Sequence, residues 1–256
     1  MKGVTTVTKR ELHAFFVSPV AYAFLVLFLL IAGYFFYRSL TYFSYVSLQA
    51  GYDRGASGIL NPNEAVLAPL YSNLVFLMLF ALPILTMRLF AEEKKSGTLE
   101  LLMSYPLTVP QIVFGKLLAA LAVFALGLVS ALLYPIILAA LGSIEWAPVL
   151  TAYLGLLLVA SAFCSVGLLF SAMTENQIIA AAATFAVLLG LWAIGWITSF
   201  LPGALGMALN QLSVYFHFSE FNRGVLNSND ALFFVSLTVY FLFLTIMVLK
   251  NRSWKS

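Results

Sequence analysis

Charged residues are scarce in this sequence. Asp, Glu, Lys and Arg make up 9% of the 256 residues and hydrophobic residues make up 62%, whereas soluble domains carry about 25% and about 45–50%. So few charges cannot cover a water-exposed surface, which excludes a soluble globular domain. The single cysteine, Cys164, excludes an internal disulfide framework and any CxxC metal or redox site. The composition is that of an integral membrane protein.

The sequence also lacks the signatures of several catalytic and transport classes. No charged residue falls in the core of a predicted span, which argues against proton relays and charge-coupled transporters. The Gly-Lys pair at 115–116 is no phosphate loop, because Pro110 and Leu117 stand where a glycine and a hydroxyl are required. His13 and His217 are expected on opposite sides of the membrane without an HExxH motif, and the serines of the spans have no histidine as a base. We therefore expect no catalytic, cofactor-binding or metal-binding residue in this chain.

Long apolar runs are what the sequence has in abundance. Each comes close to the roughly 20 apolar residues that a spanning helix needs. The six predicted spans are residues 20–37, 70–87, 112–141, 149–171, 178–200 and 231–249. The fold class predicted is therefore an all-α integral membrane protein, with one transmembrane domain over residues 1–256. That length leaves no room for a separate soluble domain, so any energy source must lie in another protein.

The connections between the spans differ in length. Residues 38–69 contain three glycines and Pro62 and are predicted to form an extracytoplasmic structured loop or short interfacial helices. Residues 172–177 are so few that spans four and five must form an antiparallel hairpin. Residues 201–230 form the second long extracytoplasmic loop, which is apolar enough to dip into the membrane or lie along its surface.

Single residues within and beside the spans predict kinks, a helix cap and the position of a lysine. Pro83 and Pro135 are expected to kink spans two and three. Thr108 and Gln111 have the spacing of a capping box at the start of span three. Lys116 is expected near the headgroups, where a lysine can extend its ammonium to water.

Small residues in span four recur at four-residue spacing. Such pairs allow helices to approach closely. Packing within one bundle is the ordinary interpretation and a dimer seam is the alternative. The pairs are Ala160 with Cys164, Ser161 with Ser165, and Gly167 with Ser171.

Residues 1–18 have the pattern of an amphipathic helix. The pattern predicts an interfacial helix lying under the membrane; a solvated basic leader that only sets topology is the alternative. Val4, Val7, Ala14 and Phe15 fall on one side and Thr6, Lys9, Arg10 and His13 on the other, with Glu11 intruding on the apolar side.

The distribution of basic residues predicts the orientation. Of the thirteen Lys and Arg residues, only Arg38, Arg54 and Arg223 fall on the side of the two long loops. Since cytoplasmic segments carry the excess of Lys and Arg, both termini and the segment between spans two and three are predicted to be cytoplasmic.

That segment, residues 88–111, is named here the coupling segment. Leu99, Leu102 and Met103 predict one face of a short helix, and Gly97 permits a sharp turn before it. A short amphipathic helix held between two spans can transmit a push from a docked partner. The alternative is a solvated loop whose charges only fix topology.

One stretch of the sequence resembles a known family. It is similar to the segment between the second and third spans of ABC-2-type permeases, especially the gliding-motility and nitrous-oxide-reductase-maturation branch, and reads MRLFAEEKKSGTLELLMSYPLTVPQIVFGK. KREL, FFVSPVAY, NPNEAVLAPL and HFSEFNRGV match in the same order. The resemblance implies the permease subunit of an ABC exporter in the plasma membrane of a bacterium or archaeon. Two permease chains, identical or related, would sit in the bilayer on two copies of a separate ATPase that binds ATP and Mg, with no nucleic acid as partner.

The resemblance also implies where the ATPase couples. The coupling segment would enter a cleft of the ATPase and the N-terminal helix would lie along the same interface. Glu93 is expected to pair with a basic residue of the ATPase or to cap the coupling helix. A membrane scaffold or insertase that works without an ATPase is the alternative function. The residues that the resemblance assigns to ATPase coupling are Glu92, Glu93, Gly97, Thr98, Glu100, Lys9, Arg10 and Glu11.

Overall fold

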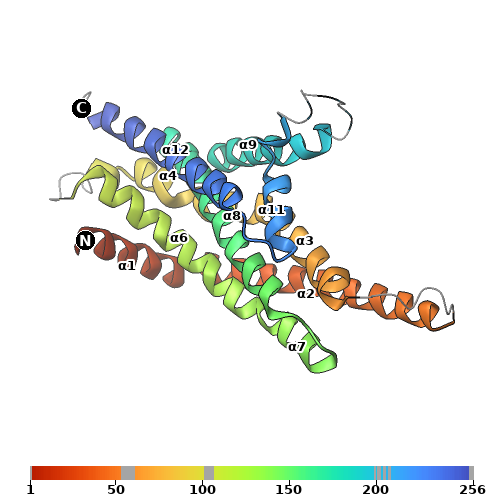
Figure 1. The fold of residues 1–256 in the computed structure, drawn as a ribbon. Helices are drawn as coiled ribbons and strands as arrows, with labels where there is room; N and C mark the ends of the chain where they lie inside the picture. Colours follow the sequence, from red (N-terminus) through yellow and green to blue (C-terminus); the bar gives the residue numbers. More distant parts are fainter. Residues whose placement is uncertain are drawn as a thin grey trace.

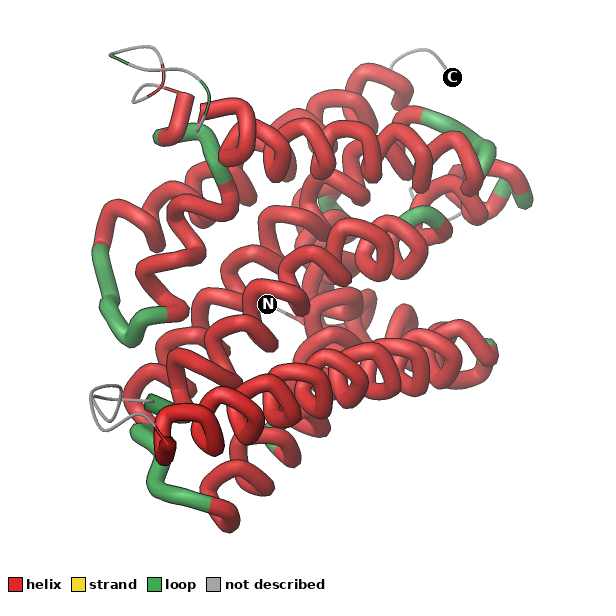
Figure 2. The backbone as a smooth tube through the Cα atoms, turned by 90° about the vertical axis from the view of Figure 1, so that its right-hand side faces the viewer, coloured by secondary structure: helices red, strands yellow, loops and turns green. Residues whose placement is uncertain are grey.

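The fold comes from a computed structural model that describes residues 2–52, 61–100, 107–198, 200, 203, 206 and 209–253. Every regular element within these ranges is a helix (Figure 1 and Figure 2). In chain order the elements are α1 (Lys2–Val17), α2 (Pro19–Tyr52), the π-helical turn η1 (Asn63–Leu67), α3 (Ala68–Thr86), α4 (Arg88–Lys95), α6 (Val109–Ala131), α7 (Leu133–Leu141), α8 (Trp146–Met173), α9 (Gln177–Thr198), α11 (Val214–Asn222) and α12 (Ser228–Ser253).

Six of these helical stretches are long and apolar enough to cross a membrane. They confirm the predicted all-α membrane fold with six spans. The stretches are Pro19–Gln49, Asn63–Lys95, Val109–Leu141, Trp146–Met173, Gln177–Thr198 and Ser228–Asn251.

Helix α8 is the centre of the bundle. About 72% of its apolar stretch is buried, against 17% for α9 and 22% for α12. It packs against α3, α6, α9, α11 and α12, and Figure 1 shows it passing between them. The outer helices therefore keep broad apolar faces that suit lipid or another membrane protein.

Small residues allow the neighbours of α8 to approach it closely. A Cβ at Gly155 would lie 2.8 Å from the Phe221 Cβ of α11, and one at Gly167 would overlap the Thr86 side chain of α3. Ala160, Cys164, Ser165 and Ser171 are also buried within the chain. Packing inside one bundle is thus the correct interpretation of this pattern, and a dimer seam through these buried residues is excluded.

Helix α2 is much longer than the first predicted span. It continues to Tyr52, so the boundary predicted at residue 38 is wrong. The hydroxyls of Thr41, Ser44 and Ser47 donate to carbonyls four residues earlier at 2.9, 2.9 and 2.8 Å. These bonds accommodate polar residues in a helix that meets no proline until Pro62. Figure 1 shows the end of α2 projecting past the start of α3.

Both predicted proline sites lie beside a break in a helix. Pro83 has no N–H for the helix ladder, and α3 ends at Thr86 one turn later. Pro135 likewise leaves the carbonyl of Ala131 without its donor, and Leu132 separates α6 from α7 there. At the start of α6, the Thr108 N–H donates to Gln111 Oε1 at 3.0 Å, which confirms the capping box.

The segment at 201–230, where a long loop is predicted, contains the short helix α11. Its Ser213 cap accepts from the Phe216 N–H at 3.2 Å, and Val214, Phe218 and Phe221 are buried against the bundle. Burial of this apolar face explains why the segment is too hydrophobic for a free linker. The connection between α8 and α9 spans only residues 174–176, as the hairpin requires.

Candidate functional site

Helix α4 forms the first part of the coupling segment. It follows α3 after the single residue Met87 and ends at Lys95. Gly97 then adopts a φ of +70°, a left-handed conformation that glycine adopts without strain, which confirms the sharp turn. The chain is helical again at 98–100, but Leu102 and Met103 lie outside the described residues.

Hydroxyl groups close the exposed end of α4. The Ser96 hydroxyl donates to the Glu92 carbonyl at 2.9 Å, and the Thr98 hydroxyl donates to the Glu93 carbonyl at 3.4 Å. Carbonyls in the last turn of a helix have no partners within it, so these bonds stabilise the helix end. The turn that carries Gly97 is therefore held to α4 rather than loosely attached.

Helix α1 lies along the first turns of α6 (Figure 1). Val7 and Phe15 are buried as predicted, whereas Ala14, expected on the same side, is exposed. The two helices touch at Gly115, where a Cβ would lie only 2.6 Å from the Val7 Cβ. The Thr8 hydroxyl also donates to the Gly115 carbonyl at 3.2 Å. Glycine at 115 is thus what lets α1 approach α6.

Three buried charges and one half-exposed arginine join α1, α4 and α6. We call these residues, Arg10, Glu11, Glu93 and Lys116, the charge cluster. The Lys116 ammonium is fully buried and lies 2.9 Å from Glu11 Oε1 and 3.0 Å from Glu93 Oε1. It also donates to the Leu89 carbonyl at 2.6 Å. The expectation that Lys116 extends toward the headgroups is therefore wrong, because two carboxylates hold it inside the protein.

Arg10 completes the balance of charge in the cluster. Its Nη2 lies 2.7 Å from Glu93 Oε1, and half of its side chain is exposed. Two cations thus face two anions, which offsets part of the cost of removing these charges from water. The Lys116 ammonium also lies 5.0 Å from the centre of the Phe90 ring, where a cation is attracted to the aromatic face.

Arg88 forms a second link between α4 and α1. Its guanidinium donates to the Ala14 carbonyl at 3.3 Å and to the Ser18 hydroxyl at 2.9 Å. It also lies over the Phe15 ring at 5.1 Å. A cation at the C-terminal end of a helix interacts favourably with the last carbonyls. Arg88 therefore binds the start of α4 to the junction of α1 and α2.

Helix α8 holds the other side of α4. The Ser171 hydroxyl accepts from the Phe90 and Ala91 N–H groups at 2.9 and 3.1 Å and donates to the Met87 carbonyl at 2.8 Å. Lys94 donates to the Ala172 carbonyl near the end of α8. Ser171 satisfies backbone groups at the helix break that would otherwise be buried without a partner.

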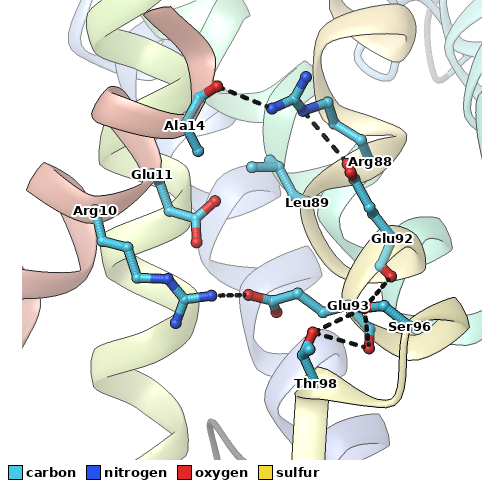
Figure 3. Close-up of a pocket in the computed structure, with 9 residues that line it drawn as sticks. All are labelled: Arg10, Glu11, Ala14, Arg88, Leu89, Glu92, Glu93, Ser96 and Thr98. Atoms are coloured by element: carbon cyan, nitrogen blue, oxygen red, sulfur yellow. Dashed lines mark hydrogen bonds and ion pairs between the residues drawn. The ribbon is translucent and has the colours of Figure 1, made fainter. Parts of the chain in front are cut away.

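A polar pocket opens between α1 and α4 next to the charge cluster. Its volume is about 210 Å³. Figure 3 shows α1 on one side and α4 with Ser96 and Thr98 on the other, with the side chains of Glu11 and Glu93 between them. The lining residues are Arg10, Glu11, Ala14, Arg88, Leu89, Glu92, Glu93, Ser96 and Thr98.

A comparison with known protein families covers nearly the whole chain. A family model described as "ABC-2 family transporter protein" matches residues 5–254. The chain belongs to the ABC-2 transporter family. No curated protein matches the sequence. Family membership makes this ABC-2 protein a multi-pass membrane permease component of an ABC transporter.

The predicted coupling residues of the ABC-2 protein fall into two groups. Glu11 and Glu93 are buried in the charge cluster, where Glu93 pairs with Arg10 and Lys116 of its own chain. The others lie on the surface around the Gly97 turn and on the outer face of α1. These exposed residues are Glu92, Gly97, Thr98, Glu100, Lys9 and Arg10.

Four residues hold α4 in the ABC-2 protein in a way that the sequence did not predict: Arg88, Lys94, Lys116 and Ser171. A signal for Lys116 was present, because Glu11 on the apolar side of α1 requires a buried cation. The partners of Arg88, Lys94 and Ser171 carry no comparable signal. Among the described residues, no group of three or more His, Cys, Asp or Glu could hold a metal ion.

Proposed function

We propose that this chain is the permease subunit of an ABC exporter. In this proposal the coupling segment is moved by the conformational change of a separate ATPase. The charge cluster carries this proposal. Through Lys116 and Glu93 it joins α4 to the third membrane span, and through Arg10 and Glu11 it joins both to α1. A force on the Gly97 turn therefore acts on three helices together.

The ATPase would dock on the exposed residues around the Gly97 turn and on α1. Glu92 and Glu100 present carboxylates there, and Glu92 keeps 58% of its side chain exposed. A basic side chain of the ATPase in the pocket beside Glu92 would meet this charge. Lys9 and Arg10 on α1 would face acidic residues of the same partner. Opposite charges that meet across an interface fix its register.

Motion would pass from the docked turn into the membrane along two routes. Helix α4 follows α3 with only Met87 between them, so a displacement of α4 acts directly on the second span. The second route runs through Lys116 into α6. The breaks near Pro83 and Pro135 are the places where the second and third spans would bend as a pathway opens.

The complete transporter would contain two permease chains, identical or related, on two ATPase subunits that bind ATP and Mg. Its membrane would be the plasma membrane of a bacterium or archaeon, with both permease termini in the cytoplasm. The excess of basic residues on the side of α4 supports this orientation. The broad apolar faces of α2, α9 and α12 leave surface for the second permease chain as well as for lipid.

Co-purification tests the proposed partner directly. The tagged chain is isolated in mild detergent and its companions are identified by mass spectrometry. We expect an ABC ATPase with the wild type and a several-fold loss of it with the double variant Glu92→Ala/Glu100→Ala. The matched control is Glu64→Ala, which removes an exposed carboxylate outside the coupling segment. Absence of any ATPase from the wild type would favour a membrane scaffold or insertase.

A further inference from the structure

A buried histidine–aspartate pair lies far from the coupling segment. His217 of α11 and Asp230 in the first turn of α12 are 4% and 3% exposed. The Nδ1 atom of His217 lies 2.6 Å from Asp230 Oδ1, and Nε2 lies 2.9 Å from the Gln211 carbonyl. Asn222 of α11 donates to the Ala68 carbonyl at 2.9 Å, so this pair lies at the opposite end of α3 from α4.

The geometry of His217 requires a bound proton. A backbone carbonyl only accepts, so Nε2 must carry a hydrogen to bond Gln211. A second proton must lie between Nδ1 and the carboxylate, because two bare acceptors repel at 2.6 Å. Neutral imidazole carries only one N–H. The pair therefore holds one proton more than a neutral imidazole beside a carboxylate.

That extra proton belongs on the imidazole. Imidazole is a stronger base than a carboxylate. Asp230 lies in the first turn of α12, where the positive end of the helix dipole favours a negative charge. With the proton there, the site would be an imidazolium next to an aspartate. The ring of His217 also stacks on Phe233 at 4.1 Å, where the aromatic face attracts a cation.

No other charge within the packed helices replaces this pairing. Asp230 is the one acidic residue that forms an ion pair with His217 among the described residues. Helices α3, α8 and α9 contain no Asp, Glu, Lys, Arg or His, and Glu220 faces Arg223 at 4.0 Å. The remaining titratable or charged residues of α11 and its neighbours α3, α8, α9 and α12 are Tyr71, Tyr153, Cys164, Tyr215, Tyr240, Lys250 and Arg252.

We propose that His217 and Asp230 form a buried proton-binding site that fastens α11 to the first turn of α12 and releases it as pH rises. Loss of the proton leaves a lone pair on Nδ1 against a carboxylate in an apolar site. Asp230 Oδ2 is buried and bonds to no other described residue, so nothing else there compensates the anion. One proton leaves per opening, so the ratio of docked to released α11 falls about tenfold per pH unit once release begins.

Nitrogen NMR tests whether the proton is present. The chain contains only two histidines, so the variant His13→Gln leaves His217 as the single signal from the protein. With ¹⁵N-histidine in lipid nanodiscs at neutral pH, we expect both ring nitrogens to show shifts of protonated nitrogen. A neutral tautomer with one bare nitrogen would overturn the proposal. The NMR measurement does not depend on an ATPase, so its failure can be distinguished from failure of the proposed function.

The variant Asp230→Asn separates the proton from the hydrogen bonds. An asparagine amide can donate to Nδ1 while Nε2 still donates to Gln211, so docking of α11 is retained without an extra proton. We expect a neutral imidazole in this variant. An imidazolium there would contradict the role of Asp230.

Spin labels report whether α11 is released. Labels replace the exposed Tyr215 on α11 and Leu232 on α12 in a Cys164→Ala background. Once pH exceeds the value at which a free imidazole loses its proton, about 6.5, we expect a second distance population that grows about tenfold per pH unit relative to the first. Asp230→Asn should show a single population throughout. A wild-type distance distribution that does not change with pH would overturn the proposed release of α11. The same pH response in Asp230→Asn would also overturn it.

Discussion

The ammonium of Lys116 lies 3.0 Å from the carboxylate of Glu93, and this contact joins the third membrane span to the coupling segment. Glu93 is at the same time 2.7 Å from Arg10 of the N-terminal helix. One carboxylate thus connects two helices that are far apart in the sequence. Displacement of α4 cannot leave α1 and α6 in place without separating buried charges.

Removal of the buried cation should destabilise the protein strongly. In Lys116→Met, Glu11 and Glu93 remain buried beside each other without the lysine, so we expect a loss of about 3–5 kcal/mol in the free energy of unfolding. Denaturant unfolding in detergent micelles measures this loss. Lys9→Met removes an exposed lysine from α1 and should change stability by less than about 0.5 kcal/mol. Equal effects of the two variants would mean that the cluster does not hold the helices.

An apolar replacement of the cluster should restore stability without restoring coupling. Glu11→Leu, Glu93→Met and Lys116→Met together remove the buried charges and keep side chains of similar length. Such replacements are neutral or stabilising by about 1–4 kcal/mol in other proteins. We expect thermal unfolding near that of the wild type but several-fold less permease-dependent ATP hydrolysis in the purified complex. Wild-type hydrolysis in this variant would show that the charges do not transmit motion.

Loss of the Ser171 hydroxyl should weaken the attachment of α4 to α8. Ser171→Ala leaves the Phe90 and Ala91 N–H groups without their acceptor at a buried helix break, and we expect a cost of about 1–3 kcal/mol. The matched control is Ser130→Ala, because that exposed hydroxyl donates only to the carbonyl of Leu126 one turn earlier. Thermal unfolding of the two variants compares them. A control as unstable as Ser171→Ala would contradict this role.

The turn at Gly97 should tolerate no Cβ without strain. Nothing lies within 4 Å of a Cβ built there, so Gly97→Ala tests the backbone alone. At a φ of +70° an alanine should cost about 1–2 kcal/mol and shift the turn that meets the ATPase. Gly142 also has open space around it but is extended at φ −168°, so Gly142→Ala serves as the control. Unchanged ATPase capture and stability in Gly97→Ala would remove the turn from the interface.

Most of the fold follows from local properties of the sequence. The apolar runs predict the six spans, since a membrane helix satisfies its own backbone hydrogen bonds. The capping box at Thr108 and the turn at Gly97 are likewise local and were predicted correctly. The extension of α2 to Tyr52 was not, because polar residues that suggested a loop bond their hydroxyls back to the carbonyls of the helix.

The sequence did not predict how the charged residues of the site pair with one another. The coupling segment could be located from its charge and from its resemblance to ABC-2 permeases, but the partners of its residues could not. Glu93 was expected to pair with an ATPase residue or to cap the coupling helix, and Lys116 to reach the headgroups, whereas the structure places the two side chains 3.0 Å apart. Their pairing depends on where the fold places α4 beside α6, which spacing along the chain does not encode.

The sequence alone determined that this is a six-span membrane protein of the ABC-2 type, because hydropathy, proline and glycine act on the residues nearest to them. The tertiary structure decided which charges are buried and which are free to meet a partner. Glycine at 115 lets α1 approach α6, and that approach places Glu11 on Lys116. Burial then makes these charges depend on one another, since an unpaired charge inside the protein costs far more than one in water.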